Sequence, residues 1–297
     1  MRVNPNIAPN ILNALFQTQD QEQTALEQLS TQKRVNVPSD DPLAAAQVVA
    51  NQDQSAQAAQ YLQNIDTLTV QMQTADSALS SVVTALTQAI NIGVQGSDGT
   101  LPATNLQQLA QTVQSIQSQL VQLGNTSISG TYLFGGTATT TPPFTLDPSS
   151  ASGVTYNGNN NVNNIDLGNG SVLQANVPGS QLFQNAGGDV FNSIQQLITA
   201  LQSGNTASVA TATTQVRTAF DQLTTQRGFY GDGINQLSAT QGFLQQEQIT
   251  LKSQENNLVG VDLAQVATEL TQAQTAHQAA LAAAARILPT TLLDYLR

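Results

Sequence analysis

The chain has 297 residues, of which only 27 are charged, 8 basic and 19 acidic, for a net charge of −11. This surplus of carboxylates argues against a nucleic-acid partner, because phosphate binding needs clustered lysine and arginine, and against docking on an anionic membrane surface. The absence of cysteine excludes disulfides, cysteine-ligated metal and a thiol nucleophile.

Aromatic residues make up 4% of the chain, and tryptophan is absent. This composition favours an elongated shape with a narrow aliphatic core over a globular enzyme. The N-terminal sequence MRVNPNIAPNILNALF has no apolar segment of signal-peptide type. No run approaches about 18 apolar residues, so we expect no membrane insertion. An extracellular destination would therefore need a route other than general secretion.

The first predicted helix carries leucines at helical spacing, although Gln19 and Glu22 interrupt the pattern. The segment KRVNVPSDDP, residues 33–42, follows and concentrates the scarce charge. We interpret its two cations as the last turn of that helix, opposing the helix dipole, and Pro38 as a break. Asp41 is a good N-cap and Pro42 suits the first position of the next helix, with Asp40 adding negative charge there. The predicted joint comprises Lys33, Arg34, Pro38, Asp40, Asp41 and Pro42.

Long helices are predicted through most of the remaining chain. Apolar residues alternate at spacings of three and four in four stretches, namely 65–89, 106–123, 216–258 and 263–287. A helix over 42–92 would be on the order of 75 Å long at ~1.5 Å per residue. Such narrow apolar stripes must be buried against other helices or other chains.

The middle of the chain has a different composition. Residues 130–188 are rich in Gly, Asn, Thr and Pro, and NIDLGNGSVLQANV reads as two strands around residues 168–170. We therefore predict a small β-rich insertion. A short helix follows, with four apolar residues on one face: Val190, Ile194, Leu197 and Leu201.

These elements predict a mainly α fold, an elongated bundle of long antiparallel helices with the N- and C-terminal helices paired and a small β-rich insertion. Residues 1–36 with 259–297 would form a terminal helical assembly domain. Residues 37–129 with 189–258 would form a central helical stalk, and 130–188 an outer insertion. The terminal pair buries little apolar area, so we expect it to gain order on association.

The chemistry-bearing residues have plainer explanations than catalysis. His277 is the only histidine, so no second imidazole or thiol can complete a zinc site, and a packed imidazole is expected. Gly228, Gly231 and Gly233 lack the strand and the Lys-Ser/Thr of a phosphate loop, and fit a loosened helix instead. Capping explains the adjacent Asp40 and Asp41. We predict no enzyme, no cofactor and no metal site.

Four segments carry a family resemblance. The run LSTQKRVNVPSDDPLAAAQVV (29–49) resembles the N-terminal signature of the flagellin superfamily, and its PSDDP form resembles the hook-associated protein 3 family within it. Similar stretches follow in order: GNTSISGTYLFGGTATTTPPFT (124–145), GVDLAQVATELTQAQTAHQAALAAAARI (260–287) and LLDYLR (292–297). One departure is Gln32, where the family more often has glycine, which we interpret as stiffening the end of the first helix.

The resemblance implies a structural subunit of the bacterial flagellum, acting at the hook–filament junction by polymerisation through its terminal helices. It implies export without a cleaved signal peptide to an extracellular location. The implied partners are copies of itself, hook-associated protein 1, flagellin, and a cytosolic export chaperone on the C-terminal helix. The expected assembly interface is Leu12, Leu15, Leu26, Leu29, Leu263, Val266, Leu270, Ala273 and Ile287.

Two alternatives remain open. A filament-forming flagellin belongs to the same class, but the PSDDP loop and the LLDYL ending argue against it. A helical surface protein whose β insertion binds a glycan belongs to another class. No His, Cys, Glu, Lys or Arg lies between residues 130 and 188, so a hydrolase site there is not expected.

Overall fold

The computed structural model describes residues 7–168 and 170–295, with side chains described for 10–168 and 170–285. The chain divides into two compact units. We call residues 1–57 with 246–297 the terminal unit and residues 58–245 the central unit. Helices α2 (Pro42–Gly96) and α6 (Thr206–Val259) contribute residues to both units.

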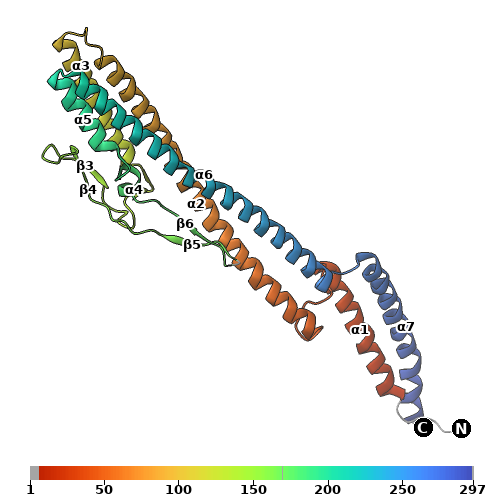
Figure 1. The fold of residues 1–297 in the computed structure, drawn as a ribbon. Coiled ribbons are helices and arrows are strands. Elements are labelled where there is room, and N and C mark those ends of the chain that lie inside the picture. Colours follow the sequence, from red (N-terminus) through yellow and green to blue (C-terminus); the bar gives the residue numbers. More distant parts are fainter. Residues whose placement is uncertain (1–6, 169, 296–297) are drawn as a thin grey trace. The chain divides into compact units, whose positions relative to one another are not determined.

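In the terminal unit, α1 (Ile7–Thr31) lies beside α7 (Leu263–Tyr295), as Figure 1 shows. Thr18 Oγ1 lies 3.2 Å from Nδ1 of His277, while the ends of the two helices nearer the joint are linked by a bridge between Lys33 and Gly260. The two helices are therefore antiparallel. This pairing confirms the predicted packing of the terminal helices and the packed position of His277.

The central unit has a helical core. Here α2 and α6 run antiparallel, because Arg227 of α6 pairs with Asp76 and Gln241 donates to Asp66 at 2.8 Å. Helices α3 (Ala103–Gly124) and α5 (Val190–Ser203) pack together and complete the core. The apolar face predicted for α5 is fully buried, and the N-cap of this helix is Asp189, which accepts from the amide of Asn192. The predicted helices are confirmed because each buries the stripe that its spacing defines.

Between α3 and α5, the described residues form four two-stranded antiparallel hairpins, which make up the β insertion. Since isolated two-stranded hairpins are marginal in water, these need support from the core. Phe144 provides it for the hairpin that contains it: the centre of its ring lies 5.1 Å from those of Tyr156, Phe183 and Phe191. The hairpins are β1 (Ser127–Ile128) with β2 (Thr131–Tyr132), β3 (Phe144–Leu146) with β4 (Val154–Tyr156), β5 (Asn164–Asp166) with β6 (Val172–Gln174), and β7 (Gln184–Asn185) with β8 (Gly188–Asp189), with the short helix α4 (Gly179–Phe183) before β7.

The prediction of long helices, a paired terminal set and a central β insertion is confirmed. The strands predicted around residues 168–170 are β5 and β6. The three-part division at residues 36/37, 129/130, 188/189 and 258/259 stays a prediction.

Candidate functional site

The helix joint begins where α1 ends. Gln32 takes the left-handed conformation, with a φ of 58°, directly after Thr31. Lys33 then bridges Gly260, and the amide of Arg34 donates to the carbonyl of Val259 at 2.7 Å. The prediction that Lys33 and Arg34 form the last helical turn is therefore wrong, because the chain leaves the helix at Gln32 to pair with the segment between α6 and α7.

Arg34 connects two helix ends within the joint. Its Nη2 donates to Oδ2 of Asp41 at 3.1 Å and to the carbonyl oxygen of Leu258 at 2.9 Å. The Leu258 carbonyl belongs to the last turn of α6, where a cation is favoured by the negative end of the helix dipole. Arg34 was predicted to interact with the end of α1. It instead interacts with the last turn of α6 and with the residue that caps α2.

Asp41 is confirmed as the N-cap of α2. Its Oδ1 accepts from the amide of Ala44 at 3.1 Å, and Pro42 is the first helical residue. This amide and the guanidinium of Arg34 lower the pKa of Asp41.

Asp40 does not act mainly on the helix dipole. Its Oδ2 accepts from the amides of Val37 and Asn36, both at 3.0 Å, and these bonds lower the pKa of Asp40. The carboxylate therefore closes the loop that contains the exposed Pro38. Asp40 was expected to add negative charge at the N-terminus of α2, but it instead stabilises a local turn. The loop needs this turn because the amides of Asn36 and Val37 have no helical or sheet partner.

Asp262, which was not predicted, caps α7. Its Oδ1 accepts from the amides of Ala264 at 2.9 Å and Gln265 at 3.3 Å. The signal was available, since an aspartate directly before an apolar-periodic run is a helix start. Capping aspartates thus begin both helices that leave the joint.

The residues predicted for assembly fall into three groups. Val266 and Ala273 are buried, and Leu15 and Leu270 are half-buried, on the faces where α1 and α7 meet; Ala25 of α1, which was not predicted, is also buried there. Leu12, Leu26, Leu29 and Leu263 are exposed. The side chain of Ile287 lies outside the described residues.

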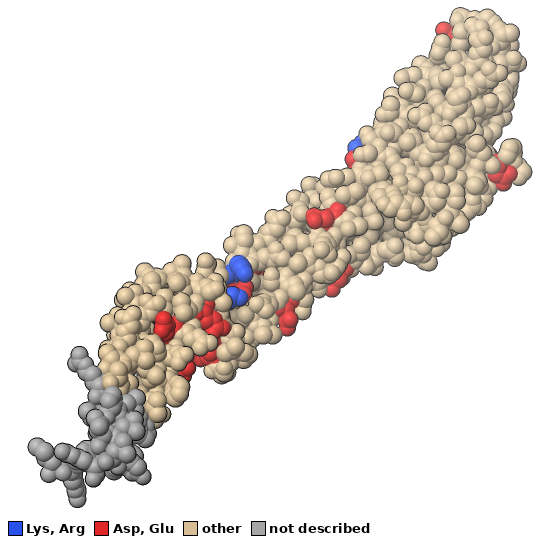
Figure 2. All heavy atoms as spheres, turned by 180° about the vertical axis from the view of Figure 1, so that it is seen from behind, with Lys and Arg blue, Asp and Glu red and all other residues tan. Residues whose placement is uncertain are grey.

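Phe16 was not predicted, yet it is 58% exposed on α1. Among the described side chains, sixteen large apolar ones are exposed, and ten of these belong to the terminal unit. The charged side chains of this unit are mostly carboxylates, which Figure 2 shows in red. The terminal unit therefore combines uncovered apolar area with negative charge.

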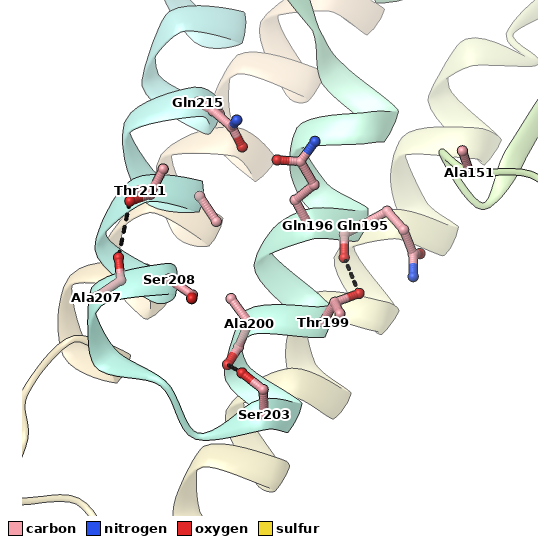
Figure 3. Close-up of a pocket in the computed structure, with 11 residues that line it drawn as sticks. Ala151, Gln195, Gln196, Thr199, Ala200, Ser203, Ala207, Ser208, Thr211 and Gln215 are labelled. Atoms are coloured by element: carbon pink, nitrogen blue, oxygen red, sulfur yellow. Dashed lines mark hydrogen bonds between the residues drawn. The ribbon is translucent and has the colours of Figure 1, made fainter.

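A groove of about 510 Å³ lies between α5 and α6 (Figure 3). Alanine, serine, threonine and glutamine line it, with no acid or base among them. The hydroxyls of Thr199, Ser203 and Thr211 each donate to a carbonyl of their own helix, at 2.9, 2.8 and 3.0 Å. None of the lining residues is a base that could activate these hydroxyls, so the groove lacks the groups needed for nucleophilic catalysis.

Helix α2 contains an 18-residue stretch with a mean hydropathy of 1.3, apolar and long enough to cross a membrane by composition. Its apolar face supplies the core of the central unit, where Leu79, Val82 and Leu86 are fully buried. Core packing therefore accounts for part of its hydrophobicity, since 39% of the stretch is buried.

Paired terminal helices, a capped joint and an exposed apolar terminal unit define a helical structural subunit. The family model for the bacterial flagellin N-terminal helical region matches residues 3–139, and the model for the C-terminal helical region matches residues 213–296. The chain belongs to the bacterial flagellin superfamily.

Among its relatives is flagellar hook-associated protein 3 of Salmonella typhimurium, 29% identical over 277 residues, which are 85% of this chain and 86% of that one. A flagellar hook-associated protein from Vibrio parahaemolyticus, 20% identical, has the same fold over 74% of this chain and 100% of its own, with a TM-score of 0.68. The flagellar junction protein FlgL from Legionella pneumophila matches 72% of this chain and 100% of its own at a TM-score of 0.61 and 14% identity.

Proposed function

We propose that this chain is a structural subunit of the bacterial flagellum that forms a layer at the hook–filament junction by polymerising through its terminal unit. The observation that carries the proposal is the concentration of exposed large apolar side chains in that unit, ten of sixteen among the described residues. Fully burying a large apolar side chain contributes about 1.5–3 kcal/mol, and covering one that is about half exposed contributes roughly half of that, so contact between copies stabilises a polymer. The names of the relatives above support the same role.

The partners follow from that role. Copies of the chain form the layer, hook-associated protein 1 lies on the hook side, and flagellin lies on the filament side. A cytosolic chaperone holds the C-terminal helix before export, which takes place without a cleaved signal peptide to an extracellular position. Residues 1–36 with 259–297 form the assembly domain, 37–129 with 189–258 the stalk, and 130–188 the outer insertion.

The interface residues remain those expected from the sequence, with their tasks divided by burial. Leu15, Val266, Leu270 and Ala273 hold α1 against α7 within one chain, whereas Leu12, Leu26, Leu29 and Leu263 are exposed and available to neighbours. Ile287 is proposed on sequence alone.

Antibody labelling of isolated flagella tests the proposal. We expect one band at the hook–filament boundary. Label along the whole filament would identify a flagellin instead, and its absence from flagella would reject both assignments. Purified protein provides a second reading, because a filament subunit polymerises in bulk and a junction subunit should not.

A further inference from the structure

One face of α1 is an uncovered apolar stripe. Leu12, Phe16 and Leu26 are 46%, 58% and 47% exposed. Together with Gln19 and Gln23, these residues follow one another at alternating spacings of four and three, which places them along one side of the helix. Contact with α7 occurs on another side, where Ala25 is buried, so α7 does not cover these three residues. We call Leu12, Phe16 and Leu26 the α1 stripe.

Carboxylates border this stripe. Asp20 and Glu27 are exposed and lie seven residues apart, which places both on one edge of the stripe. In an antiparallel two-fold pairing of two stripes, these carboxylates would face their own copies, and like charges in contact disfavour association. The stripe therefore fits an apolar surface with a cation beside it.

The helix joint presents such a surface. A groove of about 510 Å³ has five valines among its ten lining residues, including Val37, Val48 and Val49, and Lys33 also lines it. Val37 and Val49 are 47% and 57% exposed. In the described part of the chain, the other cations of this unit are already paired, Arg34 with Asp41 and Lys252 with Glu255, whereas Lys33 makes no direct ion pair and only contributes its charge near Glu255. We call this feature the joint groove.

We propose that the joint groove of one copy receives the α1 stripe of a second copy, with Lys33 beside Asp20 or Glu27. The inference rests on the proposed function, since it describes how copies associate. Apolar surface meets apolar surface, and the unpaired cation meets the acidic edge. The two surfaces differ, so the contact is heterologous: it repeats from copy to copy and builds a ring or a helical layer.

Disulfide cross-linking tests the contact cleanly, because the chain contains no cysteine. Full-length chain carrying Val37→Cys is mixed with full-length chain carrying Leu26→Cys and a tag of different mass, then oxidised mildly. We expect about tenfold more mixed dimer than when Val37→Cys is mixed with Leu146→Cys, which is similarly exposed on β3, since only the proposed contact brings the first pair together. Each variant alone should give little dimer.

A charge exchange tests the pairing of Lys33. Adding Lys33→Glu to the first chain should lower the yield severalfold, and adding Asp20→Lys with Glu27→Lys to the second chain should restore it. Sedimentation velocity of the same charge variants without cysteines gives a second reading should a cysteine variant fail to fold. Equal self-association of the single and exchanged variants would overturn the contact.

The inference and the proposed function fail in different ways. If the protein forms a band at the junction but the Val37–Leu26 pair cross-links no better than the control pair, the contact is wrong and the function stands. If the protein is absent from the junction, the function fails whatever the cross-linking result.

Discussion

At the scale of single residues, Gln32 is the position under most strain in the joint. Its φ of 58° lies in the left-handed region, which disfavours a side chain by about 1–2 kcal/mol. The position is the first past the end of α1, where glycine is the usual residue. Gln32 was interpreted from the sequence as stiffening the end of α1, but its conformation shows that it strains the backbone there instead. The bridge between Lys33 and Gly260 holds the conformation in place.

Gln32→Gly is expected to stabilise the terminal unit by about 1 kcal/mol by relieving this strain. Amide exchange in α1 should slow about fivefold where it requires opening of the helix. Gln23→Gly, the same change at an exposed position inside α1, should instead cost about 1 kcal/mol. Faster exchange in both variants would contradict the strain.

Arg34→Gln should raise the pKa of Asp41 toward its ordinary value of 3.8, because the guanidinium is one of the groups that lower it. The pKa of Asp40 should stay low, since the amides of Val37 and Asn36 set it. Carbon-13 titration of the two carboxyl groups measures both values. A parallel rise in both would mean that the whole loop had opened.

The sign of the pH dependence follows from these lowered values. A carboxyl whose pKa is lowered by folding stabilises the folded state at every pH above its pKa in the unfolded chain, which is near 4. This stabilisation is lost as the pH falls from there through the pKa of the folded state. The joint should therefore loosen in acid, below about pH 4.

At the scale of elements, glycines in the long helices have opposite roles. A Cβ added at Gly231 in α6 meets nothing within 4 Å, so this glycine only weakens the helix. A Cβ at Gly93 in α2 would collide with the hydroxyl of Thr213 in α6. That threonine is buried and donates to the carbonyl of Val209 at 2.7 Å, so it cannot easily move.

Gly231→Ala should therefore raise the free energy of unfolding by about 1 kcal/mol, whereas Gly93→Ala should lower it by about 1–3 kcal/mol through overpacking. Denaturant unfolding of the two variants beside the parent chain compares them directly. Equal stabilisation by both would show that α2 and α6 are not closely packed at Gly93.

Helix periodicity predicted α2, α3, α5, α6 and α7 well, because each buries one face and repeats the signal many times. The orientation of α1 was harder. Leu12 and Leu15 both fit a helical stripe, but only the packing of α7 decides that Leu15 is half-buried and Leu12 exposed. The joint was partly missed for a similar reason, since the bridge between Lys33 and Gly260 joins residues that are far apart in sequence.

At the scale of the whole molecule, the residues proposed for assembly are different from those that stabilise the fold. Phe16 in the terminal unit and Val172 on β6 are both 58% exposed, so neither side chain contributes much to the core. Replacing either with aspartate should leave the free energy of unfolding within about 0.5 kcal/mol of the parent. Only the first lies on the surface proposed to contact another copy.

Phe16→Asp should accordingly abolish incorporation at the hook–filament boundary in cells, while Val172→Asp is incorporated normally. Circular dichroism melting curves of both purified proteins serve as the folding control. Incorporation of Phe16→Asp at the parent level would remove the α1 stripe from the assembly surface.

The ring cluster around Phe144 also determines where this chain can change length. The β3–β4 hairpin is anchored at its base by these rings, whereas its turn is exposed at Ser149. Residues inserted at that turn would leave every ring contact in place, and longer loops cost little extra closure entropy. This turn is therefore a suitable place to carry a peptide tag or an epitope.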